Sequence, residues 1–429
     1  MYKAMQRFAI NINNFTKPNS GLNSFQLIRT FLSQAYYCQE AWEKRLNSPI
    51  FQKINLDELY YELDQRFQKS RQLSAVDVDI FANATNSDAF IDELLDIVHK
   101  LRLTADTGNT LNSTGHAVIR ILLQYKKHDD LLNVLDDRLN YGLFLDYYTS
   151  NILMDSYWKS NDFTSGARVA SQLMLQEEYE HPISRSLSLL HCYNYLSKPG
   201  KWPIPTAPVE PEEEIKVRVK YLRNPYNDDH FDLKEPDKIV GKTLAMFCKQ
   251  KKDSLNKSLG IVGWALYNKN EKVLECAKEV QNNGTLLYKE VLDLVPDESD
   301  SKNIISQLPS ESADVEELLI SNVKKAVDTM SEKDIADQCE TFSKWEAERM
   351  KALEEQKERL TIAKNIKDIE DLKTAMKEKE TKLWFFENEE KIEFEIEEAL
   401  EKMIVPKTKK KSKVDDDYIP PEVHSRQSN

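Results

Sequence analysis

Apolar residues recur at steps of three and four positions along most of the chain, which is the spacing of residues on one face of an α-helix. The clearest example is a predicted helix over residues 88–103, where Ser87 and Asp88 can cap the first turn. Its expected buried stripe consists of Phe90, Ile91, Leu94, Leu95, Val98 and Leu101. Further helices are predicted over residues 36–46, 56–69, 184–196, 237–250, 255–268 and 271–282. Because no convincing strand pattern is found, the chain is predicted to be all-α.

Residues 114–182 contain two copies of a similar helical hairpin. Tyr125 and Asp130 in the first copy match Tyr157 and Asp162 in the second, at an offset of 32 residues. Repetition near this period is typical of an α-solenoid, in which each helix pair buries its apolar face only against its neighbours. Such a fold offers an extended surface for holding a partner and rarely encloses a site for chemistry.

The second copy carries a sequence that resembles a pentatricopeptide repeat (PPR). The resemblance lies in the run from Asn140 to Tyr157, which reads NYGLFLDYYTSNILMDSY. The PPR family forms solenoids of helical hairpins of about 35 residues each and reads single-stranded RNA at about one base per repeat. The resemblance therefore implies a PPR/TPR-like α-solenoid that binds RNA.

Other regions resemble, in particular, the PPR proteins of the mitochondrial small ribosomal subunit. They are the run Arg29–Tyr36 followed by Trp42–Arg45, the run Met174–Pro182, and the charged C-terminal helical region. The similarity covers roughly residues 29–195 and extends more loosely to residue 285. It implies a structural component of that subunit in the mitochondrial matrix. Its partners would be the small-subunit ribosomal RNA and neighbouring mitochondrial ribosomal proteins.

The PPR resemblance also suggests two candidate RNA-binding residues. In that family, one base-contacting position lies early in the first helix of a repeat and the other is the last residue of the repeat. These positions correspond to Asn151 and Asp146 in this chain. The alternative for Asn151 is that it caps or braces a helix. Because the first hairpin lacks the usual Gly between Lys127 and Asp129, a long sequence-reading tract is not expected.

Charge is distributed unevenly along the chain. The formal net charge of −13 is opposite to that of a simple electrostatic nucleic-acid binder, and residues 331–405 hold 22 acidic against 14 basic residues. Residues 1–39, by contrast, contain no Asp or Glu. An acid-free, basic start with an amphipathic pattern over residues 2–12 predicts a mitochondrial transit peptide at 1–30, the alternative being an ordinary basic N-terminus. No stretch of 18 apolar residues is present, so no membrane span is predicted.

Breaks in composition predict the domain organisation. Five prolines lie within residues 199–211, a stretch that cannot be regular helix. From Ser310 to Val405, by contrast, there is neither Gly nor Pro across 96 residues. The latter is predicted to form two or three long helices, in part a coiled coil or an antiparallel hairpin. The predicted parts are the transit peptide 1–30, a solenoid 31–294 with an irregular insertion at 197–236, a linker 295–312, long helices 313–405 and a disordered charged tail 406–429.

The tail contains a further candidate contact with RNA. Five lysines occur within seven residues, namely Lys407, Lys409, Lys410, Lys411 and Lys413. Such a run can hold RNA phosphates in a salt-dependent way, or it can be a solvated tail without a partner.

No catalytic, cofactor-binding or metal-binding residues are predicted. The run from Val240 to Thr243 reads VGKT, but the phosphate-binding loop needs a Gly where this chain has Pro236. His181, His191 and Cys192 lie close in sequence without the spacing of a metal site, and packing is the expected use of these side chains. The five scattered cysteines fit reduced thiols.

The predicted function is that of a non-enzymatic component of the mitochondrial small ribosomal subunit, which supports mitochondrial translation and holds ribosomal RNA through a short solenoid. No small-molecule substrate is expected. One alternative is a free mitochondrial PPR-type factor for transcript stability or processing, which requires more regular repeats and a basic groove. A second alternative is a solenoid adaptor that binds only proteins.

Overall fold

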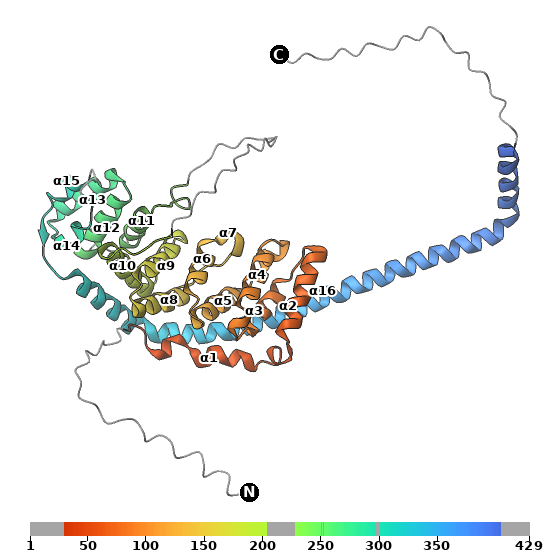
Figure 1. Cartoon of the computed structure of the whole chain (residues 1–429), viewed down its shortest axis with the longest axis horizontal. Coiled ribbons are helices and arrows are strands. Elements are labelled where there is room, and N and C mark those ends of the chain that lie inside the picture. The colour runs from red at the N-terminus through yellow and green to blue at the C-terminus, as the bar shows by residue number, and fades with distance from the viewer. Residues whose placement is uncertain (1–29, 204–227, 250, 252, 297–300, 405–429) are drawn as a thin grey trace, which may run out of the picture. The chain divides into compact units, whose positions relative to one another are not determined.

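A computed structural model describes residues 30–203, 228–249, 251, 253–296 and 301–404 (Figure 1). These residues form sixteen α-helices and only two short strands, so the prediction of an all-α fold is confirmed. The transit peptide predicted at 1–30 lies outside the described residues except for Thr30, as do most of the insertion and the whole tail. The chain divides into two compact units, Met1–Ala352 and Leu353–Asn429.

In the first unit, helices pair in sequence order, and the pairs lie side by side (Figure 1). We call the first helices of the pairs the first-helix row: α3 (Ala75–Ala84), α5 (Asn112–Gln124), α8 (Tyr147–Ser160) and α10 (Pro182–Ser197). The second-helix row consists of α4 (Ile91–Arg102), α6 (His128–Asp136), α9 (Phe163–Leu175) and α11 (Pro236–Cys248). The remaining helices are α1 (Gln39–Lys44), α2 (Leu56–Ser70), α7 (Arg138–Tyr141), α12 (Ser254–Leu266), α13 (Asn270–Asn283), α14 (Lys289–Leu292), α15 (Lys302–Ile305) and α16 (Val315–Ile404). One continuous cluster of buried apolar side chains joins these elements from Leu32 to Val327.

The structural repeat is 35 residues long, which corrects the predicted offset of 32. The first helices begin at Asn112, Tyr147 and Pro182, so consecutive starts are 35 residues apart. The left-handed residues that end α5 and α8, Lys126 and Asn161, have the same separation. The offset of 32 aligns two similar runs that lie at different places in the repeat. Tyr125 lies just after the end of α5, whereas Tyr157 lies inside α8.

Helices α11 and α12 approach each other closely at two glycines. A Cβ atom on Gly263 would lie 2.6 Å from the backbone oxygen of Gly241, and one on Gly241 would lie 2.9 Å from that of Gly263. Any side chain at either position would separate the helices. The VGKT run lies inside α11, and Lys242 Nζ donates to the backbone oxygen of Asp229 at 2.8 Å. Because these residues are helical, they do not form the loop that binds phosphate in nucleotide-binding proteins.

The segment predicted to be a linker, 295–312, is instead partly folded onto the first unit. It carries α15 and the short strand β2 (Ser310–Glu311), which pairs in parallel with β1 (Leu287–Tyr288). Ile305 and Leu308 are buried in the apolar cluster. The Ser- and Asp-rich composition concealed these apolar anchors, because two or three buried side chains are enough to hold a short segment in place.

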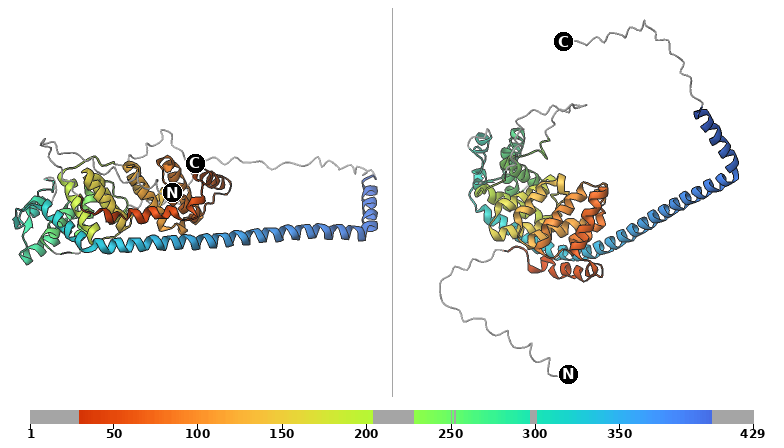
Figure 2. Two further views of the ribbon diagram at one scale, coloured as in Figure 1. Left: turned by 90° about the horizontal axis from the view of Figure 1, so that it is seen from below. Right: turned by 45° about the vertical axis from the view of Figure 1, so that its right-hand side comes forward.

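The C-terminal region consists of two helices that meet at a kink, which agrees with the two or three long helices that the sequence predicted, and the described residues form no antiparallel hairpin there. Helix α16 runs from Val315 to Ile404 with a single non-helical residue, Asn388, where the helix is kinked. Its first part, up to Ala352, belongs to the first unit and lies along the first-helix row (Figure 2). In the second unit, its apolar side chains are exposed, among them Leu360, Ile362, Ile366, Ile369, Leu372, Met376, Leu383, Trp384, Phe385 and Phe386.

His191 makes the folded state sensitive to acid. It is fully buried on α10, where Nε2 lies 2.9 Å from the Met154 backbone oxygen, and Gly166 leaves room for the imidazole ring. Burial lowers the pKa of His191 from 6.5 to about 4, against a smaller opposing effect of the Met154 hydrogen bond. Between these pH values the unfolded chain binds a proton that the folded chain does not. Stability should therefore fall by roughly 3 kcal/mol as the pH drops from 6.5 to 4, at about 1.4 kcal/mol per pH unit.

Urea unfolding at several pH values checks this expectation. His191→Gln keeps a donor for the Met154 carbonyl but cannot titrate, so its stability should fall less steeply with acid even if it is lower throughout. Burial also lowers the pKa of His116, which adds to the loss of stability in acid both in the unchanged protein and in His191→Gln. An unchanged acid dependence in His191→Gln would contradict the assignment.

Candidate functional site

The first predicted RNA-contacting residue, Asn151, lies in α8 with no exposed surface. Its Nδ2 donates to the Tyr36 hydroxyl at 2.9 Å, and its Oδ1 accepts from the Ser184 hydroxyl at 2.8 Å. These bonds join α8 to α10 and to the segment before α1. The side chain has no surface left for a base, which corrects the base-contact prediction and supports the alternative that Asn151 braces helices.

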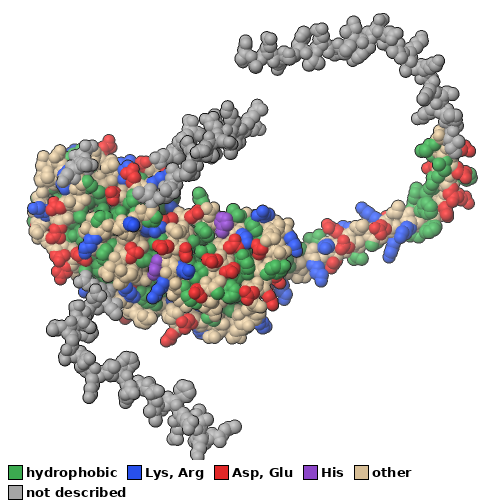
Figure 3. All heavy atoms as spheres, viewed as in Figure 1, with side chains coloured by type: hydrophobic (Ala, Val, Ile, Leu, Met, Phe, Trp, Pro, Cys, Tyr) green, Lys and Arg blue, Asp and Glu red, His purple; other side chains and the backbone are tan. Residues whose placement is uncertain are grey.

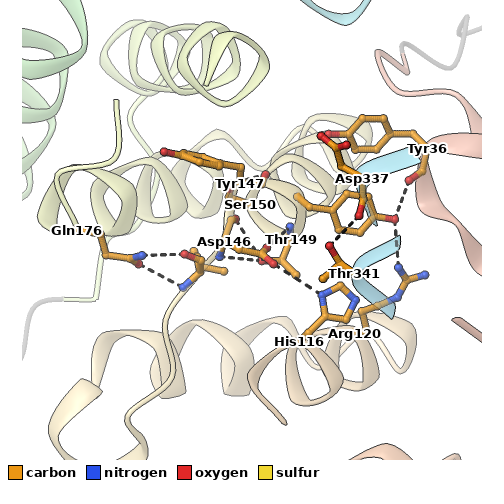
Figure 4. A network of polar contacts seen from close by, with 12 residues as sticks. Tyr36, His116, Arg120, Asp146, Tyr147, Thr149, Ser150, Gln176, Asp337 and Thr341 are labelled. Atoms are coloured by element: carbon orange, nitrogen blue, oxygen red, sulfur yellow. Dashed lines mark hydrogen bonds and ion pairs between the residues drawn. The ribbon is translucent and has the colours of Figure 1, made fainter. Parts of the chain in front are cut away.

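The second predicted residue, Asp146, is the N-cap of α8 (Figure 4). Its Oδ1 accepts from the backbone N–H of Thr149 at 2.7 Å, and the Thr149 hydroxyl completes a capping box. Its side chain is 48% exposed, and Oδ2 lies 4.0 Å from Nδ1 of His116. Desolvation raises the pKa of Asp146, but His116 and the hydrogen bonds from Thr149 outweigh it, so the pKa is lowered overall. Asp146 thus remains accessible, and its contact with RNA stays a prediction.

His116 lies in α5 inside a ring of aromatic side chains. Its ring centroid is 5.0 Å from that of Trp345, 5.3 Å from that of Trp42, 5.4 Å from that of Phe342 and 5.8 Å from that of Tyr148. Desolvation by burial lowers the pKa of His116, against an opposing effect of Asp146. This packing brings α1, α5, α8 and α16 together at one point, beside Asp146.

The segment from Thr30 to Tyr37 is fixed to α8 by one buried carboxylate. Asp155 Oδ1 accepts from the backbone N–H groups of Phe31 and Leu32 at 2.9 and 3.2 Å. Its Oδ2 accepts from the Tyr37 hydroxyl at 2.7 Å and lies 2.7 Å from Lys159 Nζ. Because Asp155 lies one helical turn after Asn151, the segment covers the part of α8 for which the PPR resemblance implied contact with RNA.

The first part of α16 covers the rest of the first-helix row. Asp334 accepts from the Tyr36 hydroxyl at 2.8 Å and lies 3.2 Å from Nε2 of His181, the N-cap of α10. Near the other end, Nε of Arg349 donates to Oδ2 of Asp79 in α3 at 2.5 Å. Figure 4 shows α16 and the N-terminal segment on the same side of α5 and α8. The row that would read bases is therefore occupied by the chain itself.

Sequence reasoning missed Asp79, Asp155, Asp334 and Arg349 as the residues that close this surface. A signal was present for the two buried aspartates, since each is flanked by apolar residues within a helix, in VDVDIF and ILMDSY. A carboxylate in such a position needs a buried partner. Nothing local identifies that partner, which for Asp79 is 270 residues away.

A concave, lysine-rich surface lies elsewhere, between α11, α12 and α13. A cavity of about 300 Å³ is lined by four lysines that we call the lysine patch, Lys249, Lys251, Lys257 and Lys272. Trp264 and Cys276 also line it, together with Glu275 and Glu279. Lys272 pairs with Glu275 at 2.7 Å. Among the lining residues, the other three lysines are then accompanied by one carboxylate, that of Glu279. On the face of the first unit seen in Figure 3, by contrast, acidic and basic side chains are interspersed.

The described residues provide no further candidate site among the predicted lysines, metal ligands and cysteines. Lys407, Lys409, Lys410, Lys411 and Lys413 lie outside the described residues. In the described ranges, no group of three or more His, Cys, Asp or Glu side chains is arranged to hold a metal ion. Within the same ranges, no helix is long and apolar enough to cross a membrane. The five cysteines are free thiols.

Comparison with protein families gives one match that spans most of the chain. The model of the family described as "Mitochondrial 28S ribosomal protein S27" matches residues 3–375. The matched range includes both helix rows, the lysine patch and the part of α16 that covers the first-helix row.

Proposed function

Because this chain belongs to the mitochondrial 28S ribosomal protein S27 family, we propose that it is a non-catalytic scaffold that holds ribosomal RNA within the small subunit. The chain is a component of the mitochondrial small ribosomal subunit and is located at the mitochondrial ribosome. The family match over residues 3–375 is the observation that carries the proposal.

The helix pairs constitute an α-solenoid of PPR type in this proposal. The repeat of 35 residues between the starts of α5, α8 and α10 supports it, because that is about the length of a PPR hairpin. The solenoid does not read bases with its first-helix row, since Asn151 is buried and the chain covers the row. RNA is instead held by shape and by phosphate contacts, which do not require an open reading surface.

The lysine patch is the proposed phosphate-binding surface. Its charges are concentrated in one concavity although the whole chain is acidic, with a net charge of −13. On the face of the first unit seen in Figure 3, the acidic side chains among the basic ones should repel phosphates and so limit indiscriminate RNA binding there. The lysine run Lys407–Lys413 is a second proposed contact with RNA, and residues 1–30 are the proposed transit peptide.

The second unit is proposed to dock on a neighbouring ribosomal protein as a coiled coil. Its helix exposes a stripe that includes Ile362, Ile366, Ile369 and Met376, which are spaced by three, four and seven residues and each more than half exposed. An exposed apolar stripe of this kind is typical of a surface that interacts with a partner protein. Cross-linking of purified small subunits should connect this stripe with one neighbouring protein.

Sedimentation of detergent-lysed mitochondria tests the proposed function. The protein should migrate with the small subunit and with the assembled ribosome, and should resist a moderate salt wash. Its complete loss should reduce mitochondrial translation and small-subunit abundance. A light, nuclease-sensitive peak away from both particles, with normal translation after loss, would overturn the scaffold proposal in favour of a free RNA-binding factor.

Charge reversal in the lysine patch should weaken RNA binding. We expect Lys249→Glu/Lys251→Glu/Lys257→Glu to lower the affinity of the full chain for single-stranded RNA by at least about tenfold at 0.1 M salt. The salt dependence of binding should also decrease, because about 0.7 counterions are released per phosphate contact on a single strand. Fluorescence anisotropy at several salt concentrations measures both quantities. Lys278→Glu is the matched control, since Lys278 is exposed on α13 but does not line the cavity. Equal effects of the two variants would contradict the patch.

A further inference from the structure

A second cavity, separate from the lysine patch, lies between residues 41–51, the end of α3 and the first part of α16. Its volume is about 520 Å³, which is within the range of about 300–1,000 Å³ usual for small-ligand sites. We call it the arginine cleft. Its polar lining includes Lys44, Arg45, Asn83, Cys339, Glu346 and Arg349. Its aromatic lining consists of Trp42, Phe51, Phe342 and Trp345.

Arg45 supplies an unneutralised charge to this cleft. Its Nε donates to the backbone oxygen of Asn83 at 3.0 Å, and its Nη1 donates to that of Trp42 at 2.8 Å. Nη2 keeps no hydrogen-bond partner, and no carboxylate lies within 4.0 Å of the guanidinium, in the described part of the chain. Burial first, and then repulsion by Arg120 and Arg349, lowers the pKa of Arg45 to about 9. An anion placed beside Nη2 would relieve that repulsion.

The carboxylates near Arg45 form no ion pair with it in the described part of the chain: Glu346 lines the cleft, and Glu43 opposes only part of the lowering of the Arg45 pKa. Arg120 is only 7% exposed, yet it donates to neutral acceptors, the Tyr37 backbone oxygen at 2.8 Å and Gln39 Oε1 at 2.9 Å. Arg349 is the one arginine of the three with a buried carboxylate, Asp79. Guanidinium groups held by backbone carbonyls are preorganised to donate their remaining N–H groups to an anion such as phosphate.

The apolar part of the cleft lining is largely aromatic. The Phe342 and Trp345 ring centroids are 5.6 Å apart, and Phe342 lies 5.8 Å from Trp42. The Arg45 guanidinium lies 3.5 Å from the Trp42 ring centroid, and that of Arg349 lies 5.1 Å from the Phe51 centroid. Aromatic rings interleaved with guanidinium groups form the type of surface on which unpaired bases stack.

We propose that the arginine cleft binds one unpaired nucleotide, with its phosphate at Nη2 of Arg45 and its base against the wall of Phe342 and Trp345. The proposal rests on the proposed function of holding RNA and adds a site that the PPR comparison does not assign. The nucleotide belongs either to a single-stranded RNA segment or to a free mononucleotide. A peptide with a carboxylate side chain would complement the charge of Arg45, but it would provide no planar group to stack on the aromatic side chains.

The cleft contains a native reporter, because Cys339 lines it and is exposed. Cys276 lines the lysine-patch cavity and reports on that surface independently. The rate of alkylation of each cysteine in the full chain can be followed by mass spectrometry, without RNA and with a mixed-sequence 12-nucleotide RNA. At about ten times its dissociation constant, RNA should slow alkylation of Cys339 about tenfold, because only the unoccupied cleft reacts. AMP and GMP in place of RNA distinguish the free mononucleotide from the strand, and either result supports the site.

Arg45→Ala tests the phosphate contact. It should abolish the protection of Cys339, weaken RNA binding about tenfold and reduce the salt slope by about 0.7. Lys53→Ala is the matched control, since it removes a nearby positive charge that does not line the cleft. Arg45→Lys, which keeps the charge but not the fork, should retain part of the protection if folding is intact.

The two proposals fail in distinguishable ways. If RNA protects Cys276 and lysine-patch variants bind weakly, but Cys339 reacts at its free rate, the arginine cleft is wrong and the proposed function stands. If RNA protects neither cysteine and does not bind the full chain, both are wrong. If a glutamate-rich peptide protects Cys339 whereas RNA and mononucleotides do not, the cleft is a peptide site and the nucleotide proposal is overturned.

Discussion

Replacing Arg349 with methionine is expected to destabilise the first unit by about 3–5 kcal/mol. The Arg349 guanidinium pairs with Asp79 in a site where both side chains are almost fully buried, at 5% and 0% exposure. Removing one partner leaves a buried charge without compensation, which is the most costly way to break an ion pair. Asp79 also accepts from Thr114 at 2.8 Å and from Asn83 at 3.0 Å, and these bonds offset only part of the loss. Urea unfolding of the full chain measures the change.

The matched control is Lys344→Met on the same helix. Lys344 pairs with Glu340 at 2.7 Å, but both side chains are more than 60% exposed, so the expected loss is below about 1 kcal/mol. Asp79→Asn/Arg349→Met should be more stable than the sum of the single changes predicts, because no buried charge remains. Additive losses in this cycle, or a loss for Arg349→Met no larger than that of the control, would contradict the role of the pair.

Replacing Asp155 with alanine is expected to release the N-terminal segment from α8. The change removes the acceptor of two backbone N–H groups, at Phe31 and Leu32, and of the Tyr37 hydroxyl. Hydrogen bonds to a charged acceptor contribute about 1.5–3 kcal/mol each, and the backbone donors would need water as a new partner. We expect a loss of about 3 kcal/mol. Limited proteolysis with trypsin should cleave after Lys44 and Arg45 much faster than in the unchanged protein.

Asp155→Asn should have an intermediate effect, since its amide oxygen still accepts from the two backbone groups. Asp130→Ala is the matched control, because Asp130 is an exposed aspartate in the first turn of α6. Its expected cost is within about 1 kcal/mol, from the lost helix-dipole interaction. If the proteolysis of Asp155→Ala matches that of Asp130→Ala, the N-terminal segment is held by other contacts.

The covering of the first-helix row determines which surfaces of this acidic chain remain available to RNA. A PPR solenoid that reads bases needs its first helices open, whereas Asn151, Asp155 and Asp79 are used here to hold the chain's own segments. The proposed RNA contacts therefore lie at the lysine patch and the arginine cleft, where positive charge is concentrated in concavities. Such a division leaves the repeats as a rigid support.

The positions of the helices could be predicted from the sequence because their causes are local. The three- and four-residue spacing of apolar side chains predicted α4, α12 and α13 within a few residues, and Ser87 accepts from Ala89 N–H as the predicted cap. The rejection of a phosphate loop at VGKT also followed from neighbouring residues alone. The repeat period was predicted wrongly, since the local match of a tyrosine and an aspartate at an offset of 32 outweighed the true period of 35 residues.

What only the tertiary structure decided is where distant residues meet. Asn151 has the residue type and position of a base-contacting residue, but Tyr36, 115 positions earlier, occupies its amide. Asp79 accepts a hydrogen bond from Arg349, 270 residues later in the chain. Tyr36 donates to Asp334, 298 residues later. The arginine cleft likewise combines residues from both ends of the first unit. Periodicity and capping act within a helical turn or two and so determine the helices. The covering of one helix row by another segment depends on long-range burial and charge pairing, for which a single sequence carries no local signal.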